Sequence, residues 1–160
     1  MNLTNAVVLI TGGTAGIGRS IAKTLAESGA RVAITGRDKD RLEEAARTLG
    51  VFPIHADVSN EADVIRSYRE VLAKFGDLDI LVNNAGVGVF KSLVDMDRAN
   101  FDTVFATNVT GAMLMGREAA KHFIKRNLRR HYQHRLDGRP PRRGEWHGVL
   151  CEQVRAARHD

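Results

Sequence analysis

The stretch Thr11-Gly12-Gly13-Thr14-Ala15-Gly16-Ile17-Gly18 joins an apolar run, Ala6 to Ile10, to an amphipathic helical pattern from Ile17 to Glu27. A strand, a glycine turn and a helix in that order favour phosphate binding. Glycines let the backbone approach a ligand closely, and the helix start offers free N–H groups and the positive end of its dipole. A tight strand-to-helix turn that binds nothing is the alternative interpretation of this stretch alone.

The 160-residue chain is long enough for one domain with its own hydrophobic core. It contains no apolar run of about 18 residues, and its first residues lack a signal-peptide pattern. We therefore expect no membrane span and a cytoplasmic location. Cys151 is the single cysteine, so we expect neither a disulfide framework nor a metal site.

The net charge of +5 is unevenly distributed along the chain. Residues 1–126 contain 16 basic and 15 acidic side chains, whereas residues 127–160 contain eight Arg, no Lys and four acidic side chains. We therefore predict a folded domain at 1–126 and an Arg-rich irregular tail at 127–160. Such a tail could bind nucleic acid, but acids interrupt it and no aromatic series accompanies it, so we do not favour this function.

Three further strand–helix pairs follow the glycine turn. Apolar runs predict strands at 31–35, 51–56 and 78–82, and amphipathic patterns predict helices at 38–49, 59–75 and 97–126. Four alternations with short connections predict an α/β fold with a doubly wound, parallel, Rossmann-type sheet. Ligands of such sheets bind beyond the carboxyl ends of the strands.

Polar side chains follow three of these strands and should meet the glycine turn. Arg37 lies where the adenosine ribose of a dinucleotide would lie, and a cation there favours a 2′-phosphate and so NADP(H) over NAD(H); a solvated turn arginine is the alternative. Asp57 either accepts a hydrogen bond from an adenine amino group or helps to cap the next helix. Asn83 and Asn84 either line the ligand or simply occupy a turn.

Asn108 lies inside the predicted helix 97–126, where Asn is a mediocre helix former. Its apolar neighbours predict partial burial, and a buried amide needs a partner or a task.

These motifs together resemble the short-chain dehydrogenase/reductase family over residues 1 to about 126. The resemblance rests on Thr11-Gly12-x-x-x-Gly16-x-Gly18, Asp57-Val58, Asn83-Asn84-Ala85-Gly86 and Thr107-Asn108-Val109-Thr110-Gly111. It implies a Rossmann-type fold, a nicotinamide cofactor, a small carbonyl or alcohol substrate and a homo-oligomeric full-length protein. The implied cofactor contacts are Gly12, Thr14, Gly16, Ile17 and Gly18 at the pyrophosphate, Asp57 and Val58 at the adenine, and Asn84, Ala85 and Gly86 beyond it. Asn108 matches the asparagine of the family's catalytic Asn-Ser-Tyr-Lys set, where it supports a proton-relay water.

The chain departs from the family after residue 126. It contains no Tyr-x-x-x-Lys, because Leu72 follows Tyr68 and Leu136 follows Tyr132 at the fourth position, and it has no Ser beyond Ser92. Residues 127–135 are too polar for the family's buried fifth strand, so we expect about four strands instead of seven. We predict an oxidoreductase by descent that is catalytically incomplete as written, or else a non-catalytic NADP-binding module.

An incomplete sheet would leave apolar surface uncovered. The strand at 78–82 would lack a neighbour on one edge. We expect the helix beside it to show Phe101, Val104, Phe105 and Met115 with few partners.

The genetic code offers a reason for this departure. Synonymous codons for residues 129–139 allow the frame one nucleotide later to read Gly-Gly-Ile-Ile-Asn-Ile-Ala-Ser-Met-Ala-Gly. From Trp146 the same frame allows Gly-Met-Ala-Tyr-Cys-Ala-Ser-Lys-Ser-Ala. These are the family's fifth strand, its Ser and its Tyr-x-x-x-Lys at the family's spacing. We therefore hypothesise a frameshifted and truncated reductase, with the shift near residues 126–129.

Overall fold

The structure is a computed structural model that describes residues 3–136 and the side chains of residues 3–126. A four-stranded parallel sheet with the order β3-β2-β1-β4 forms its centre. The strands are β1 Val7–Ile10, β2 Arg31–Gly36, β3 Phe52–His55 and β4 Ile80–Val82. The predicted α/β, Rossmann-type fold is confirmed.

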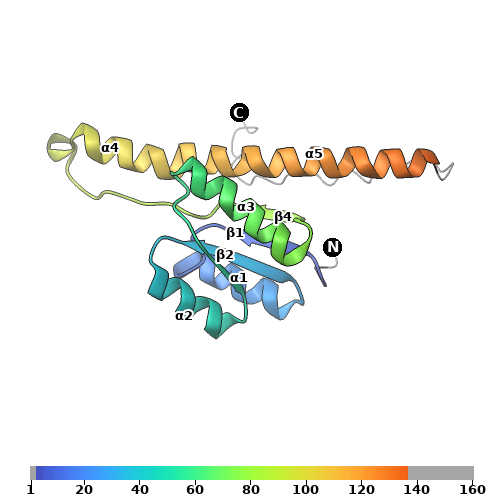
Figure 1. The fold of residues 1–160 in the computed structure, drawn as a ribbon. Coiled ribbons are helices and arrows are strands. Elements are labelled where there is room, and N and C mark those ends of the chain that lie inside the picture. Colours follow the sequence, from blue (N-terminus) through green and yellow to red (C-terminus); the bar gives the residue numbers. More distant parts are fainter. Residues whose placement is uncertain (1–2, 137–160) are drawn as a thin grey trace, which may run out of the picture.

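Helices cover both faces of the sheet, which makes three layers (Figure 1). Helices α1 (Gly16–Glu27) and α2 (Lys39–Leu49) cover one face, and α3 (Glu61–Phe75) and α5 (Ala112–Leu136) cover the other. Successive side chains of a strand point to opposite faces. Val8 and Ile10 of β1 therefore pack with α1 and α2, whereas Val7 and Leu9 pack with α3 and α5. This two-sided burial explains why β1 is apolar throughout.

Local signals in the sequence set the ends of α2 and α3. The Asp38 side chain accepts a hydrogen bond from the Arg41 N–H at the start of α2, and the Asn60 side chain caps α3. Gly50 and Gly76 end these helices with φ of 67° and 79°, a backbone region that favours glycine.

The single helix predicted at 97–126 is three consecutive helical segments. Helix α4 (Arg98–Phe105) passes into a π-helical turn at Ala106–Gly111 and then into α5, and together they form one long rod (Figure 1). Helix α5 continues to Leu136, so the tail predicted to be irregular from residue 127 is helical over its first ten residues. The stretch 127–136 contains no Gly or Pro to stop the helix. Residues 137–160 lie outside the described part.

An ion-pair cluster fastens α5 to the start of β4. Arg126 pairs with Asp79 at 2.6 Å and with Asp77 at 3.3 Å, and it donates to the Leu78 carbonyl at 3.1 Å. The other Asp79 oxygen accepts the Val7 N–H at 2.9 Å, which links the cluster to β1. Within residues 3–136, no strand pairs with the free edge of β4.

The expected apolar exposure on the long helix is only partly confirmed. Phe101 and Phe105 are 47% and 45% exposed and stack with ring centroids 4.2 Å apart, whereas Val104 is half-buried. Met115 is 1% exposed, so the expectation was wrong for this residue. The extra residue of the π turn rotates every later position by about 100° around the helix axis. Met115 therefore faces the sheet.

None of the helices in the described range is long and apolar enough to span a bilayer.

Replacing both Phe101 and Phe105 by Gln should reduce aggregation and change the melting temperature by only a few degrees, because both rings are half exposed. Replacing Met115 by Ala should instead cost about 2–5 kcal/mol, because its side chain is fully packed. Thermal melting with parallel light scattering measures both effects. If Phe101→Gln/Phe105→Gln melts as low as Met115→Ala, the assigned faces of this helix are wrong.

Candidate functional site

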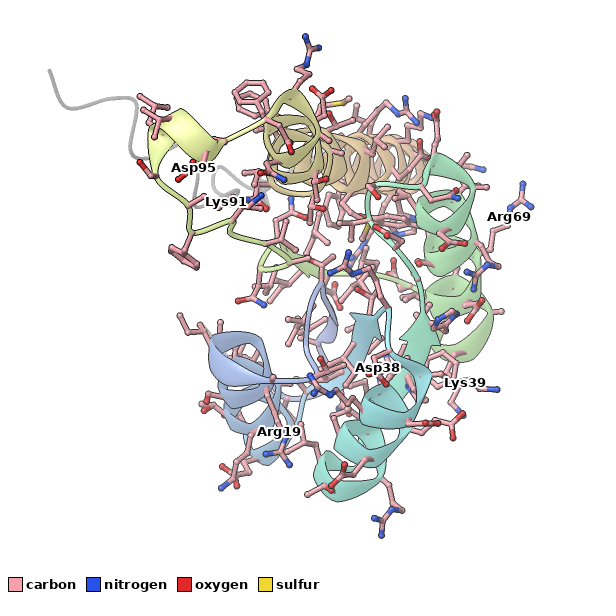
Figure 2. The ribbon with its side chains drawn as sticks, turned by 90° about the vertical axis from the view of Figure 1, so that its left-hand side faces the viewer. Arg19, Asp38, Lys39, Arg69, Lys91 and Asp95 are labelled. Atoms are coloured by element: carbon pink, nitrogen blue, oxygen red, sulfur yellow. The ribbon has the colours of Figure 1, made fainter. Side chains whose placement is uncertain are left out.

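A cavity of about 430 Å³ opens at the carboxyl edge of the sheet. Figure 2 faces this edge, with Asp38 and Lys39 at the start of α2 and with Lys91 and Asp95 on the segment that follows β4. All eleven residues predicted to contact a cofactor line this one cavity: Gly12, Thr14, Gly16, Ile17, Gly18, Arg37, Asp57, Val58, Asn84, Ala85 and Gly86. Six further residues that were not among the predicted contacts also line it: Ala15, Thr35, Gly36, Ala56, Val87 and Thr107. Ala15, Val87 and Thr107 are sequence neighbours of predicted site residues, whereas Thr35, Gly36 and Ala56 lie at or directly after the ends of β2 and β3, and these positions were the available signal.

The glycine turn needs glycine for two different reasons. Gly12 and Gly16 have φ of 67° and 54°, which other residues rarely adopt. Gly18 has no free volume for a side chain: a Cβ there would lie 2.3 Å from Asn84 Nδ2 and 2.4 Å from the Gly12 carbonyl oxygen. The start of α1 therefore lies directly against the turn and the end of β4.

Asn84 connects the end of β4 to this turn. Its side-chain N–H₂ group donates to the carbonyl oxygens of Thr11 and Gly12, each at 3.0 Å. The Thr11 hydroxyl accepts the backbone N–H groups of Asn84 and Ala85, also at 3.0 Å. Asn83 donates in the other direction, to the Ala112 carbonyl at 3.2 Å. Asn84 is thus both a turn residue and a cavity residue. Thr11, which was not among the predicted cofactor contacts, supports the position of Asn84.

Helix α1 begins without a side-chain cap. Its N-cap is Ala15, whose side chain accepts no hydrogen bond, whereas Asp38, Asn60 and Asp97 cap α2, α3 and α4. The first N–H groups of a helix have no partner within the helix. At α1 these groups belong to the residues that line the cavity, so they are available to an anion there.

Arg37 and Asp57 face each other at the cavity. Arg37 Nη1 lies 3.9 Å from Asp57 Oδ2, and the two side chains are 57% and 35% exposed. Asp57 Oδ1 accepts hydrogen bonds from the backbone N–H and the hydroxyl of Ser59 at 2.9 and 2.7 Å. Asn60 supplies the side-chain cap of α3, and Asp57 contacts the turn just before that cap, so both interpretations of Asp57 remain open.

Asn108 lies in the π-helical turn and is half-buried. Its Nδ2 donates to the Val87 carbonyl at 2.9 Å, and its Oδ1 accepts the Val87 N–H at 2.8 Å. The prediction that this amide needs a partner is confirmed. Asn108 contacts the cavity lining through Val87, because Val87 lines the cavity and Asn108 does not.

Within residues 3–126, no tyrosine lines the cavity that could donate a proton to a carbonyl oxygen. Its lining contains no Tyr, Lys or Ser. Tyr68 lies elsewhere, with its hydroxyl donating to the Met115 carbonyl at 2.6 Å. Burial raises the pKa of Tyr68 far above its ordinary value, so this phenol is a structural group.

The family model for short chain dehydrogenases matches residues 6–129. Glucose 1-dehydrogenase of Gluconobacter oxydans is 38% identical over an alignment of 128 residues, and the match covers 76% of this chain and 48% of that protein. The 11-beta-hydroxysteroid dehydrogenase 1A of Arabidopsis thaliana is 41% identical over 135 residues, 79% of this chain and 38% of that protein.

Solved structures give the same result for the fold. The 3-ketoacyl-(acyl-carrier-protein) reductase of Brucella melitensis, crystallised with NADH, is 39% identical with a TM-score of 0.76. The match covers 79% of this chain and 54% of that one. The chain thus spans about half the length, or less, of the proteins that it resembles.

Substitution by Ala should lower the stability of the chain at Gly18 and raise it at Gly116, because only Gly18 is closely surrounded by other atoms. Gly18→Ala should lower the melting temperature and weaken ligand binding at the cavity, because the methyl group would collide with Asn84 and the Gly12 carbonyl. Gly116→Ala should stabilise the chain by up to about 1 kcal/mol, because Gly116 is helical and has free space around it. Thermal melting of both variants is the measurement. Equal melting temperatures for the two would contradict this account of the turn.

Proposed function

The chain belongs to the short chain dehydrogenase family, and we propose that residues 1–126 are the cofactor-binding half of an NAD(P)-dependent oxidoreductase. The nicotinamide supplies hydride exchange with a carbonyl or alcohol when the cofactor is bound. The residues of this chain bind and orient that cofactor. The substrate is a small carbonyl compound or alcohol.

One observation carries this proposal: the uncapped start of α1 opens into a cavity that the glycine turn lines. A diphosphate fits this place because it can accept the free N–H groups and is favoured by the helix dipole. Ile17 also fits, because its side chain is 75% exposed at the cavity and a bound dinucleotide would cover it.

The other residues that line the cavity indicate where the two ends of a bound dinucleotide would lie. Arg37, Asp57 and Val58 follow β2 and β3 and would hold the adenosine end. Asn84, Ala85 and Gly86 follow β4 and would hold the part that leads to the nicotinamide. Thr107 also lines the cavity, and it stands beside Asn108, the residue that the family resemblance assigns to catalysis.

A preference for NADP(H) over NAD(H) follows from Arg37. Its side chain is more than half exposed, and its Nη1 lies 3.9 Å from Asp57 Oδ2. A 2′-phosphate would offer it a stronger, charge-assisted hydrogen bond.

We further propose that the chain is truncated and catalytically incomplete. Asn108 is the single member of the Asn-Ser-Tyr-Lys set that the sequence contains in the matching position. An amide does not titrate, so Asn108 cannot replace the Tyr as proton donor. A frameshift near residues 126–129 of a reductase gene accounts for this loss. A non-catalytic NADP-binding module is the alternative function, and nucleic-acid binding by the Arg-rich tail is not favoured.

The parent protein is expected to be a cytoplasmic homo-oligomer.

Arg37→Ala should lower the ratio of NADPH to NADH affinity by at least about tenfold, because a charge-assisted contact is worth roughly 1.5–3 kcal/mol. Fluorescence titration of the 160-residue chain with each reduced cofactor measures this ratio. Lys39→Ala is the matched control, because Lys39 is exposed at the start of α2 (Figure 2) and does not line the cavity. An unchanged ratio in Arg37→Ala would show that the cofactor assignment is wrong.

The coding DNA tests the frameshift. One nucleotide on from the present frame, it should remain open beyond the codon of Asp160 and encode Tyr-x-x-x-Lys. A protein expressed in the restored frame should oxidise NADPH with a panel of ketones and aldehydes, whereas the 160-residue chain should not. A stop codon in the shifted frame before the codon of Val149 would contradict the hypothesis, and so would turnover by the 160-residue chain.

A further inference from the structure

Arg66 on α3 does not line the cavity, yet it contacts the strand end that leads to it. Its Nη2 donates to the His55 carbonyl oxygen at 2.8 Å and to Asp63 Oδ1 at 2.7 Å, and its Nη1 donates to Glu70 at 2.9 Å. One guanidinium thus connects the last residue of β3 to the first turns of α3. The planar group has several donors in fixed directions, so it holds these acceptors in a defined arrangement.

Two further hydrogen bonds extend this connection to the cavity residues. Asp63 Oδ2 accepts the backbone N–H of Asp57 at 2.9 Å. His55 Nε2 donates to the Arg37 carbonyl oxygen at 2.9 Å. Together with the 3.9 Å contact between Arg37 and Asp57, these bonds close a ring through five residues. We call Arg37, Asp57, Asp63, Arg66 and His55 the strand-end ring.

The strength of the bonds differs around this ring. The N–H of Asp57, together with the guanidinium of Arg66, holds the pKa of the Asp63 carboxyl below its ordinary value, so Asp63 is ionised near neutral pH. Its two contacts are therefore charge-assisted. The contact between Arg37 and Asp57 is longer and more exposed. The pairing of β2 with β3, in which the Ala56 N–H donates to the Gly36 carbonyl, brings the backbones of these two cavity residues together. The other members of the ring add stronger contacts to this arrangement than the contact between Arg37 and Asp57 does.

We propose that Asp63 and Arg66 are positioning residues for cofactor selection: they hold Arg37 and Asp57 at the separation in which the cavity prefers a dinucleotide with a 2′-phosphate. This inference rests on the proposed function. Asp63 and Arg66 lie outside the cavity and belong to none of the sequence motifs quoted above. Their effect passes through the backbone of Asp57 on one side and through His55 on the other.

The affinity ratio separates positioning from stability. A residue that only stabilises the fold would change the affinities for NADPH and NADH by the same factor. A positioning residue changes the ratio, because only one of the two cofactors carries the 2′-phosphate. Arg69 provides the matched control, because it lies on the same helix, projects into solvent (Figure 2) and forms no ion pair with the described residues.

The experiment measures both affinities and the melting temperature for the 160-residue chain and its variants Arg66→Ala, Asp63→Asn and Arg69→Ala. We expect the NADPH to NADH affinity ratio to fall about fivefold to tenfold in Arg66→Ala. The fall should be smaller in Asp63→Asn, because Asn keeps an oxygen for the Asp57 N–H. Arg69→Ala should keep the original ratio.

A double variant tests whether Arg66 acts through Arg37. In the Arg37→Ala background, Arg66→Ala should cause no further fall in the ratio, because the phosphate contact is already lost. An unchanged ratio in folded Arg66→Ala or Asp63→Asn overturns the inference and leaves the proposed function intact. If the unsubstituted chain binds both cofactors equally well, the inference is wrong because there is no NADPH preference to position. If the unsubstituted chain binds neither cofactor, both the inference and the proposed function are wrong.

Discussion

The carboxamide of Asn84 donates to the carbonyl oxygens of Thr11 and Gly12, and the geometry of the cavity depends on these two bonds. They hold the end of β4 against the glycine turn that follows β1. The resulting approach leaves no volume for a side chain at Gly18, which brings the first turn of α1 into the same contact. A helix that begins there without a cap directs its free N–H groups at whatever occupies the cavity.

The strand ends around the cavity all have bonded neighbours, whereas the β4 edge of the parallel sheet has no neighbouring strand within residues 3–136. Every strand end that lines the cavity belongs to the described part of the chain, and each is tied to a neighbour by hydrogen bonds. The far edge of β4 has no neighbouring strand within residues 3–136, and the long helix beside it exposes Phe101 and Phe105. Our proposal of a cofactor-binding half without its catalytic half matches this division.

The sequence predicted the strands, the helices and the cavity residues whose positions depend on nearby residues in the chain. The apolar runs indicated the strands and the amphipathic patterns indicated the helices, because each signal acts within a few residues. The carboxyl edge of a parallel sheet then brought the predicted cavity residues together. The π turn was not predictable, because it coincides with contacts between distant residues: Asn108 with Val87, and Gly111 close against Val58. Met115 was misplaced for the same reason, and the strand-end ring also depends on contacts that no local pattern encodes.

Hydrogen exchange of backbone amides in the presence and absence of NADPH tests most directly whether this cavity binds a dinucleotide. We predict that saturating NADPH slows exchange at residues 12–18 and 84–87, because the ligand covers the glycine turn and the segment after β4. The exposed face of α2 should exchange at the same rate in both samples. If residues 12–18 exchange equally fast with and without NADPH, the cavity is not the binding site that its geometry indicates.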